Sequence, residues 1–139
     1  LPGDDPRMLA TIDAIQRHLT DTRGLVYRYG GEDGLPGAEG TFLLCTFWLA
    51  HALALAGSGE RAREVFEGAA GFATELGLLS EEVAAGSGEL LGNFPQAFSH
   101  IGLVNAAWAI SRSEEQYPGY GTPAIPFLTS WLQHWPGTW

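Results

Sequence analysis

Two adjacent carboxylates, Glu81 and Glu82, stand between apolar residues in a stretch without helical periodicity. The segment 77–100 carries them, and a new helix is expected to begin near its Asn93–Pro95. A carboxylate beside buried apolar surface can have its pKa tuned for proton transfer. Neighbouring side chains on an extended loop point in opposite directions, so one glutamate is expected to face a pocket. The segment predicts acid–base chemistry, although two adjacent loop glutamates are more often simply solvated.

A second candidate for ligand binding is Arg28, which lies between Tyr27 and Tyr29 in a glycine-rich loop over residues 23–40. A guanidinium group with aromatic neighbours suits sugar hydroxyls or carboxylates. An ordinary surface arginine is an equally weighted alternative. A loop of this length in a compact domain is usually functional or disordered. It also holds three acids, Glu32, Asp33 and Glu39.

Nucleophilic, metal and phosphate-binding chemistry are all disfavoured. Ser99 and His100 are neighbours in an expected helix and do not face each other, so His100 is interpreted as a satisfied polar residue or part of a pocket floor. The histidines are too scattered for a metal site, and Cys45 is interpreted as a small buried hydrophobe. The glycine-rich loop lacks the Lys-Ser/Thr pair of a phosphate-binding loop. No metal or cofactor is expected.

The composition excludes several classes of partner. The chain has 139 residues, enough for one domain, and a net charge of -9 without any lysine, so nucleic acid is not an expected partner. The longest apolar stretch, 41–56, is short for a membrane span, and no membrane is expected. Because no signal peptide is visible, a cytoplasmic location is expected.

The hydrophobic pattern predicts four helices of two alternating kinds. The first and third are amphipathic, whereas the second and fourth are apolar on nearly every side, and the second is expected to be buried all round. This alternation predicts an all-α fold with outer and inner layers. Asp4 or Asp5 is expected to cap the first helix, with Pro6 at its first position. The four ranges are 7–20, 41–56, 60–76 and 94–111.

Both candidate loops follow an outer helix and lead into an inner one. They are therefore expected at the same end of the inner layer, where helix N-termini offer free N–H groups to polar ligands. Residues 25–29 are expected to form a short strand-like piece. The aromatic-rich tail 114–139 stays unassigned, with one short helix expected within 123–135.

Three motifs together resemble the C-terminal part of glycoside hydrolase family 15, which includes glucoamylases and bacterial trehalases. They are Gly40–Thr46, Leu78–Glu82 and Gly92–His100, in the family's order and spacing. The resemblance covers roughly residues 1–111, so we assign 1–113 to this C-terminal portion. It implies an (α/α) barrel of inner and outer helices, of which the chain forms a part.

The resemblance also implies a chemistry and residue roles. The family hydrolyses terminal α-glucosidic bonds with inversion, using two glutamates, and its general base falls on Glu81. Glu82 is then the second choice or a neighbouring carboxylate. Arg28 matches an arginine that binds hydroxyls of the non-reducing-end glucose, and Tyr29 lines the same subsite. The implied substrate is an α-glucoside, either trehalose or the ends of malto-oligosaccharides.

One catalytic group is missing from this match. The family's general acid lies upstream, and nothing before Glu81 carries its motif. The isolated chain is therefore expected to be inactive, with the missing N-terminal part of the barrel or an oligomeric partner completing it. The alternative is a stand-alone helical domain that binds a protein through its apolar helices and catalyses nothing.

Overall fold

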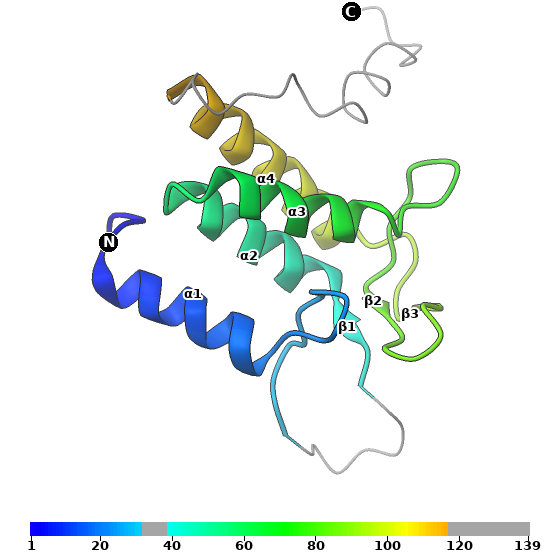
Figure 1. Cartoon of the computed structure of the whole chain (residues 1–139). Helices are drawn as coiled ribbons and strands as arrows, with labels where there is room; N and C mark the ends of the chain where they lie inside the picture. Colours follow the sequence, from blue (N-terminus) through cyan, green and yellow to red (C-terminus); the bar gives the residue numbers. More distant parts are fainter. Residues whose placement is uncertain (32–38, 117–139) are drawn as a thin grey trace, which may run out of the picture.

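The computed structural model describes residues 1–31 and 39–116, which form four helices and three short strands (Figure 1). The predicted all-α class is confirmed, because the strands have only two residues each. Asp5 caps the first helix by accepting a hydrogen bond from the Arg7 N–H, and Pro6 occupies the first turn, as predicted. The helices are α1 (Pro6–His18), α2 (Leu43–Leu55), α3 (Gly59–Ala70) and α4 (Ala97–Gln116).

The two apolar helices, α2 and α4, pack against each other, and α3 lies against both. Phe47 of α2 contacts Phe66 of α3 with ring centroids 5.7 Å apart. Gly102 lets α4 approach closely, because a Cβ there would lie 3.1 Å from the Cβ of Phe47. The amphipathic α1 packs on α2, with Ile12 buried and Ile15 partly buried against the same core. The predicted alternation of amphipathic and apolar helices is therefore confirmed.

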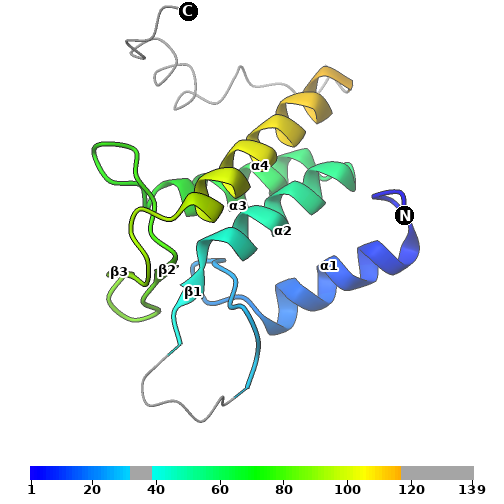
Figure 2. The same ribbon diagram turned by 180° about the vertical axis from the view of Figure 1, so that it is seen from behind.

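The direction of the helices decides where the loops lie. In Figures 1 and 2, α2 and α4 begin at the end of the molecule that holds the strands, whereas α1 and α3 end there. The loop after α1 and the loop after α3 therefore share one end with the N-termini of α2 and α4. This is the arrangement that the sequence predicts for the two candidate loops.

The sequence does not predict the small antiparallel sheet, whose strand order is β1-β2-β3. Thr41 and Phe42 were expected to be helical, but they form β1 because Thr41 pairs with Val83 and donates its hydroxyl to the Val83 carbonyl at 3.0 Å. Residues 25–29 form no strand, and only an isolated bridge joins Val26 to Thr20. The strands are β1 (Thr41–Phe42), β2 (Glu82–Val83) and β3 (Leu90–Leu91).

Other predicted boundaries are also wrong. The third helix ends at Ala70 rather than at residue 76, since the chain turns so that the Thr74 N–H bonds the Leu78 carbonyl and Gly77 adopts a φ of 74°. The fourth begins three residues late, after Pro95, and continues to Gln116.

The apolar helices are not buried all round within the described residues. Trp48 and Leu55 of α2 are 58% and 62% exposed, so the prediction of full burial for this helix is wrong here. No helix in the described ranges is both long and apolar enough to cross a membrane. Glu32, Asp33 and the helix expected within 123–135 lie outside the described residues.

Candidate active site

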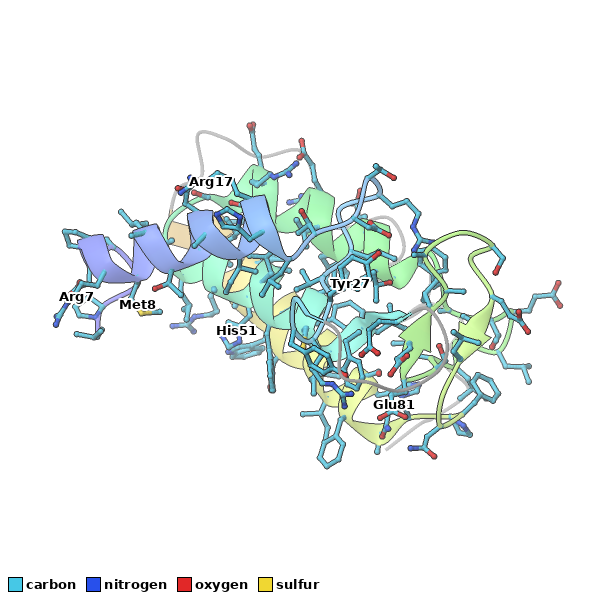
Figure 3. The ribbon with its side chains drawn as sticks, turned by 90° about the horizontal axis from the view of Figure 1, so that it is seen from below. Arg7, Met8, Arg17, Tyr27, His51 and Glu81 are labelled. Carbon is cyan, nitrogen blue, oxygen red and sulfur yellow. The ribbon has the colours of Figure 1, made fainter. Side chains whose placement is uncertain are left out.

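The backbone of Glu81 is fixed to the starts of both apolar helices. Its carbonyl accepts a hydrogen bond from the N–H of Leu43, the first residue of α2, at 3.1 Å. Its N–H donates to the carbonyl of Asn93, shortly before α4, at 3.0 Å. Figure 3 shows Glu81 on the opposite half of the molecule from Arg7 at the start of α1. The glutamate therefore sits on a rigid base at the strand end of the molecule.

The carboxylate of Glu81 is held through one of its oxygens. Oε2 accepts hydrogen bonds from the backbone N–H of Asn93 at 3.0 Å and from its side-chain Nδ2 at 2.9 Å. Gly92 makes room for this contact, because a Cβ there would lie 2.7 Å from Oε2. Gly92 also has a φ of 72°, in the left-handed region that favours glycine. The turn at Gly92 and Asn93 is thus shaped around the carboxylate.

Glu82 occupies a different environment in the middle strand of the sheet. It pairs with Phe42 on one side and Leu91 on the other, and a Cβ on Gly40 would lie 2.7 Å from its Oε2. Burial raises the pKa of Glu82 above its usual value, and the nearby charges of Glu39 and Glu81 add to this. The Arg28 guanidinium and the Gly40 N–H act in the opposite direction.

Arg28 lies over Phe42, the β1 residue that pairs with Glu82 of the acidic loop. Its guanidinium carbon lies 4.9 Å from the ring centroid of Phe42 and 5.0 Å from that of Tyr29. Its Nη2 is 3.6 Å from Oε1 of Glu39 and 3.5 Å from the Tyr29 hydroxyl. The hydrogen bond that Arg28 donates to the Tyr29 hydroxyl, with smaller contributions from the charges of Glu39 and Glu82, raises the pKa of Arg28. The structure therefore brings Arg28, Tyr29, Glu81 and Glu82 to one end of the molecule.

A short turn after α1 positions Arg28. Asp21 accepts the N–H groups of Arg23 and Leu25 on Oδ1 and binds the Arg23 guanidinium through Oδ2 at 2.7 Å. Val26 then donates its N–H to the hydroxyl of Thr46 in α2 at 3.0 Å. Sequence reasoning missed Asp21, although an aspartate two residues before Arg-Gly is a signal of an Asx turn.

The acidic loop is fastened to the first turn of α4. The Leu79 N–H donates to Nε2 of His100 at 3.3 Å, and Nδ1 of His100 lies 2.7 Å from the Gln96 carbonyl. Because Nε2 accepts, Nδ1 carries the proton and donates. Ser99 is fully buried and donates its hydroxyl to the Ser80 carbonyl at 2.7 Å. The interpretation of His100 as a satisfied polar residue is confirmed. Ser99 and His100 both form hydrogen bonds with the backbone of the acidic loop.

Metal and thiol chemistry find no support at this end of the molecule. Within residues 1–31 and 39–116, no group of three or more His, Cys, Asp or Glu side chains could hold a metal ion. Cys45 packs against the core, and burial raises the pKa of its thiol, although the charge of Arg28 opposes this. A raised pKa disfavours the reactive thiolate.

Comparison with known proteins identifies the family. Residues 1–108 match the family described as Glycosyl hydrolases family 15. The chain belongs to glycosyl hydrolase family 15. The family membership that the three sequence motifs indicated is therefore confirmed, and the alternation of apolar and amphipathic helices agrees with the barrel architecture implied by that resemblance.

The relatives of this family 15 chain are named as trehalases. It is 48% identical over 124 residues to the trehalase of Mycolicibacterium smegmatis and 47% identical over 124 residues to that of Mycobacterium tuberculosis. These matches cover 87% of this chain and 18% of each relative. The trehalase of Thermoplasma volcanium is 44% identical over 107 residues, covering 77% of this chain and 17% of the relative. No solved structure gives a significant match. The chain thus spans about a fifth of the length of these relatives.

Proposed function

We propose that this chain supplies the general base and part of the glucose-binding subsite of an inverting hydrolase of terminal α-glucosidic bonds. The observation that carries the proposal is the carboxylate of Glu81, held by Asn93 at the end of the molecule where Arg28 lies. Trehalose is the first substrate to test, because the relatives are named trehalases. The ends of malto-oligosaccharides are the second.

In the proposed reaction, Glu81 accepts a proton from the water that attacks the anomeric carbon. A separate carboxylic acid protonates the leaving oxygen from the opposite face, about 6.5–9.5 Å away in inverting enzymes. Arg28 binds sugar hydroxyls with its fork of donors, and Tyr29 forms a wall of the same subsite. Glu82 is the second choice as base, since burial and the charges of Glu39 and Glu81 favour its neutral form.

We also propose that residues 1–113 work as the C-terminal portion of a longer barrel that contributes the general acid. An exposed apolar row on α4 supports this, because such rows are normally covered by protein. The exposed side chains of this row are those of Phe98, Ile101, Val104 and Trp108. The isolated chain is then expected to be inactive. Residues 114–139 stay unassigned. We expect the complete enzyme to be cytoplasmic.

The test compares the 139-residue chain with the full-length natural chain that contains it, each as wild type, Glu81→Gln and Glu82→Gln. Glucose release from trehalose and maltose is measured, and the product anomers are followed by proton NMR before mutarotation. Inversion on α,α-trehalose gives one β- and one α-glucose, whereas retention gives α-glucose alone. The proposal requires that Glu81→Gln abolishes the activity and that β-glucose forms first. Full activity in Glu81→Gln would disprove the assignment.

A second candidate function is a stand-alone helical domain that binds a protein partner. The apolar row on α4 favours this as well, since the exposed fraction of Trp108 is 68%. Sedimentation velocity of the 139-residue chain, with and without Trp108→Glu, separates the two. A monomer whose sedimentation is unchanged by Trp108→Glu argues against the second function. If that monomer hydrolyses no sugar while the longer chain is active, the first proposal is favoured.

A further inference from the structure

We infer that Asn93 is a positioning residue for the base: it holds Oε2 of Glu81 and leaves Oε1 to take the proton from water. This inference rests on the proposed role of Glu81. Both donors of Asn93, the backbone N–H and the side-chain Nδ2, converge on the same oxygen at 3.0 and 2.9 Å. Among the described residues, no hydrogen bond reaches Oε1 of Glu81.

The contact between Asn93 and Glu81 is reciprocal, which makes it rigid. The Glu81 N–H donates to the Asn93 carbonyl at 3.0 Å, so Asn93 hydrogen-bonds both the backbone and the carboxylate of Glu81. Gly92 permits these contacts, because its positive φ turns the Asn93 N–H back toward Glu81 and its missing side chain leaves space for Oε2. A carboxylate held by two donors on one oxygen has little freedom to rotate, which fixes where its second oxygen lies.

The kind of contact suits a general base. A general base must be an ionised carboxylate, and an ionised carboxylate only accepts hydrogen bonds. Asn93 supplies two such bonds without adding a positive charge to the subsite.

The proton-transfer step follows directly. The oxygen of water forms a bond to the anomeric carbon while one of its protons passes to Oε1 of Glu81. The bond between that carbon and the glycosidic oxygen breaks, and its electron pair stays on the leaving oxygen. The separate carboxylic acid of the proposed function protonates that oxygen. Asn93 touches none of the reacting atoms and acts only through Glu81.

The test uses Asn93→Ala and Asn93→Asp in the full-length natural chain, with Ser87→Ala as control. Ser87 is exposed in the same hairpin and its hydroxyl accepts the Glu89 N–H, so its variant reports the cost of losing a side-chain hydrogen bond away from Glu81. Activity on trehalose is measured as kcat and KM separately, and thermal unfolding is recorded for each variant.

We expect Asn93→Ala to lower kcat roughly 10- to 100-fold, because a base displaced by a fraction of an ångström loses much of its effect. KM should stay within about twofold, because the subsite is unchanged. Asn93→Asp should also lower kcat, because an aspartate side chain has no N–H to donate to Oε2 of Glu81.

Three outcomes bear on this inference. A kcat of Asn93→Ala within twofold of that of Ser87→Ala overturns it. A loss of kcat that comes with a several-fold rise in KM and a lower unfolding temperature also overturns it, because a merely structural role would give that result. In the Glu81→Gln background, Asn93→Ala should cause no further loss, since it acts only through the base. If Glu81→Gln itself retains activity, the proposed function fails instead.

Discussion

Replacing Gly92 by alanine should lower kcat strongly, because it displaces the side chain of Glu81. A Cβ at this position would lie 2.7 Å from Oε2, 2.9 Å from Cβ and 3.3 Å from Cδ of Glu81. To reach ordinary contact, the carboxylate must retreat by roughly 0.7 Å, and this shift breaks its hydrogen bonds to Asn93. Misplacing a reacting group by about 1 Å can cost about 10²-fold in rate, so we expect kcat to fall roughly 10- to 100-fold.

The matched control for Gly92→Ala is Gly88→Ala in the same hairpin. Gly88 has a φ of 75°, close to the 72° of Gly92, so both substitutions carry the same backbone penalty of about 1–2 kcal/mol. A Cβ on Gly88 meets only ordinary contacts, at 3.7 Å from Phe72 and 3.8 Å from Arg23. The difference between the two variants therefore isolates the clash with the side chain of Glu81.

The assay is kcat on trehalose for the full-length natural chain, together with chemical denaturation of each variant. Gly92→Ala should lose more unfolding free energy than Gly88→Ala, because its Cβ also lies 2.9 Å from the Cβ of Glu81, and only Gly92→Ala should lose activity. A kcat of Gly92→Ala within twofold of that of Gly88→Ala would show that displacing this carboxylate does not affect catalysis. That outcome would refute the assignment of Glu81 as the base.

Three further predictions concern the groups around the base. His100→Ala should cost about 1–3 kcal/mol of unfolding free energy by chemical denaturation, because it leaves the buried N–H of Leu79 without an acceptor. Glu82→Gln should raise the unfolding temperature relative to wild type more at pH 7 than at pH 4. Arg28→Lys should raise KM for trehalose by about tenfold or more with a smaller change in kcat, since lysine lacks the planar fork that stacks on the aromatic rings.

The sign of the Glu82 prediction follows from linkage. The folded state raises the pKa of Glu82, so it binds more protons than the unfolded state between the unfolded and folded pKa values. Stability therefore falls as pH rises through that window, and the loss persists at neutral pH. Glutamine does not titrate, so Glu82→Gln removes this loss of stability. The exposed Glu89 provides the control: Glu89→Gln removes one negative charge from the same hairpin, and an equal gain from it would contradict the local explanation.

Much of the fold could be predicted from the sequence because helical periodicity reports local burial directly. The alternation of apolar and amphipathic helices gave the all-α class and the shared end of the two loops. The sheet could not be predicted in this way, because each strand has two residues and is stabilised by partners far along the chain. Thr41 pairs with Val83 across 42 positions, and no pattern within a short window contains that pairing.

The candidate site divides in a similar way. Residue type and local context pointed to Arg28 and to the pair Glu81 and Glu82, and the family resemblance selected Glu81 from that pair. The residues that position them were missed. Asn93 follows Glu81 by twelve positions, and only the hairpin between them brings the two together. Asp21 acts through a turn that packs against α2, which the sequence of the loop alone does not reveal.

The apolar helices show what a hydrophobic pattern measures. The apolar sequence of α2 predicted burial on every side, yet Trp48 is 58% exposed within the described residues. On α4, Phe98 and Trp108 are 62% and 68% exposed, whereas the polar Ser99 is fully buried. The hydrophobicity of a helix reflects how much of it is buried in the complete protein. Packing within the described residues buries only one side of α2 and of α4. The remaining apolar surface favours a barrel in which further helices cover α2 and α4, and that same barrel is where the proposed general acid must face Glu81.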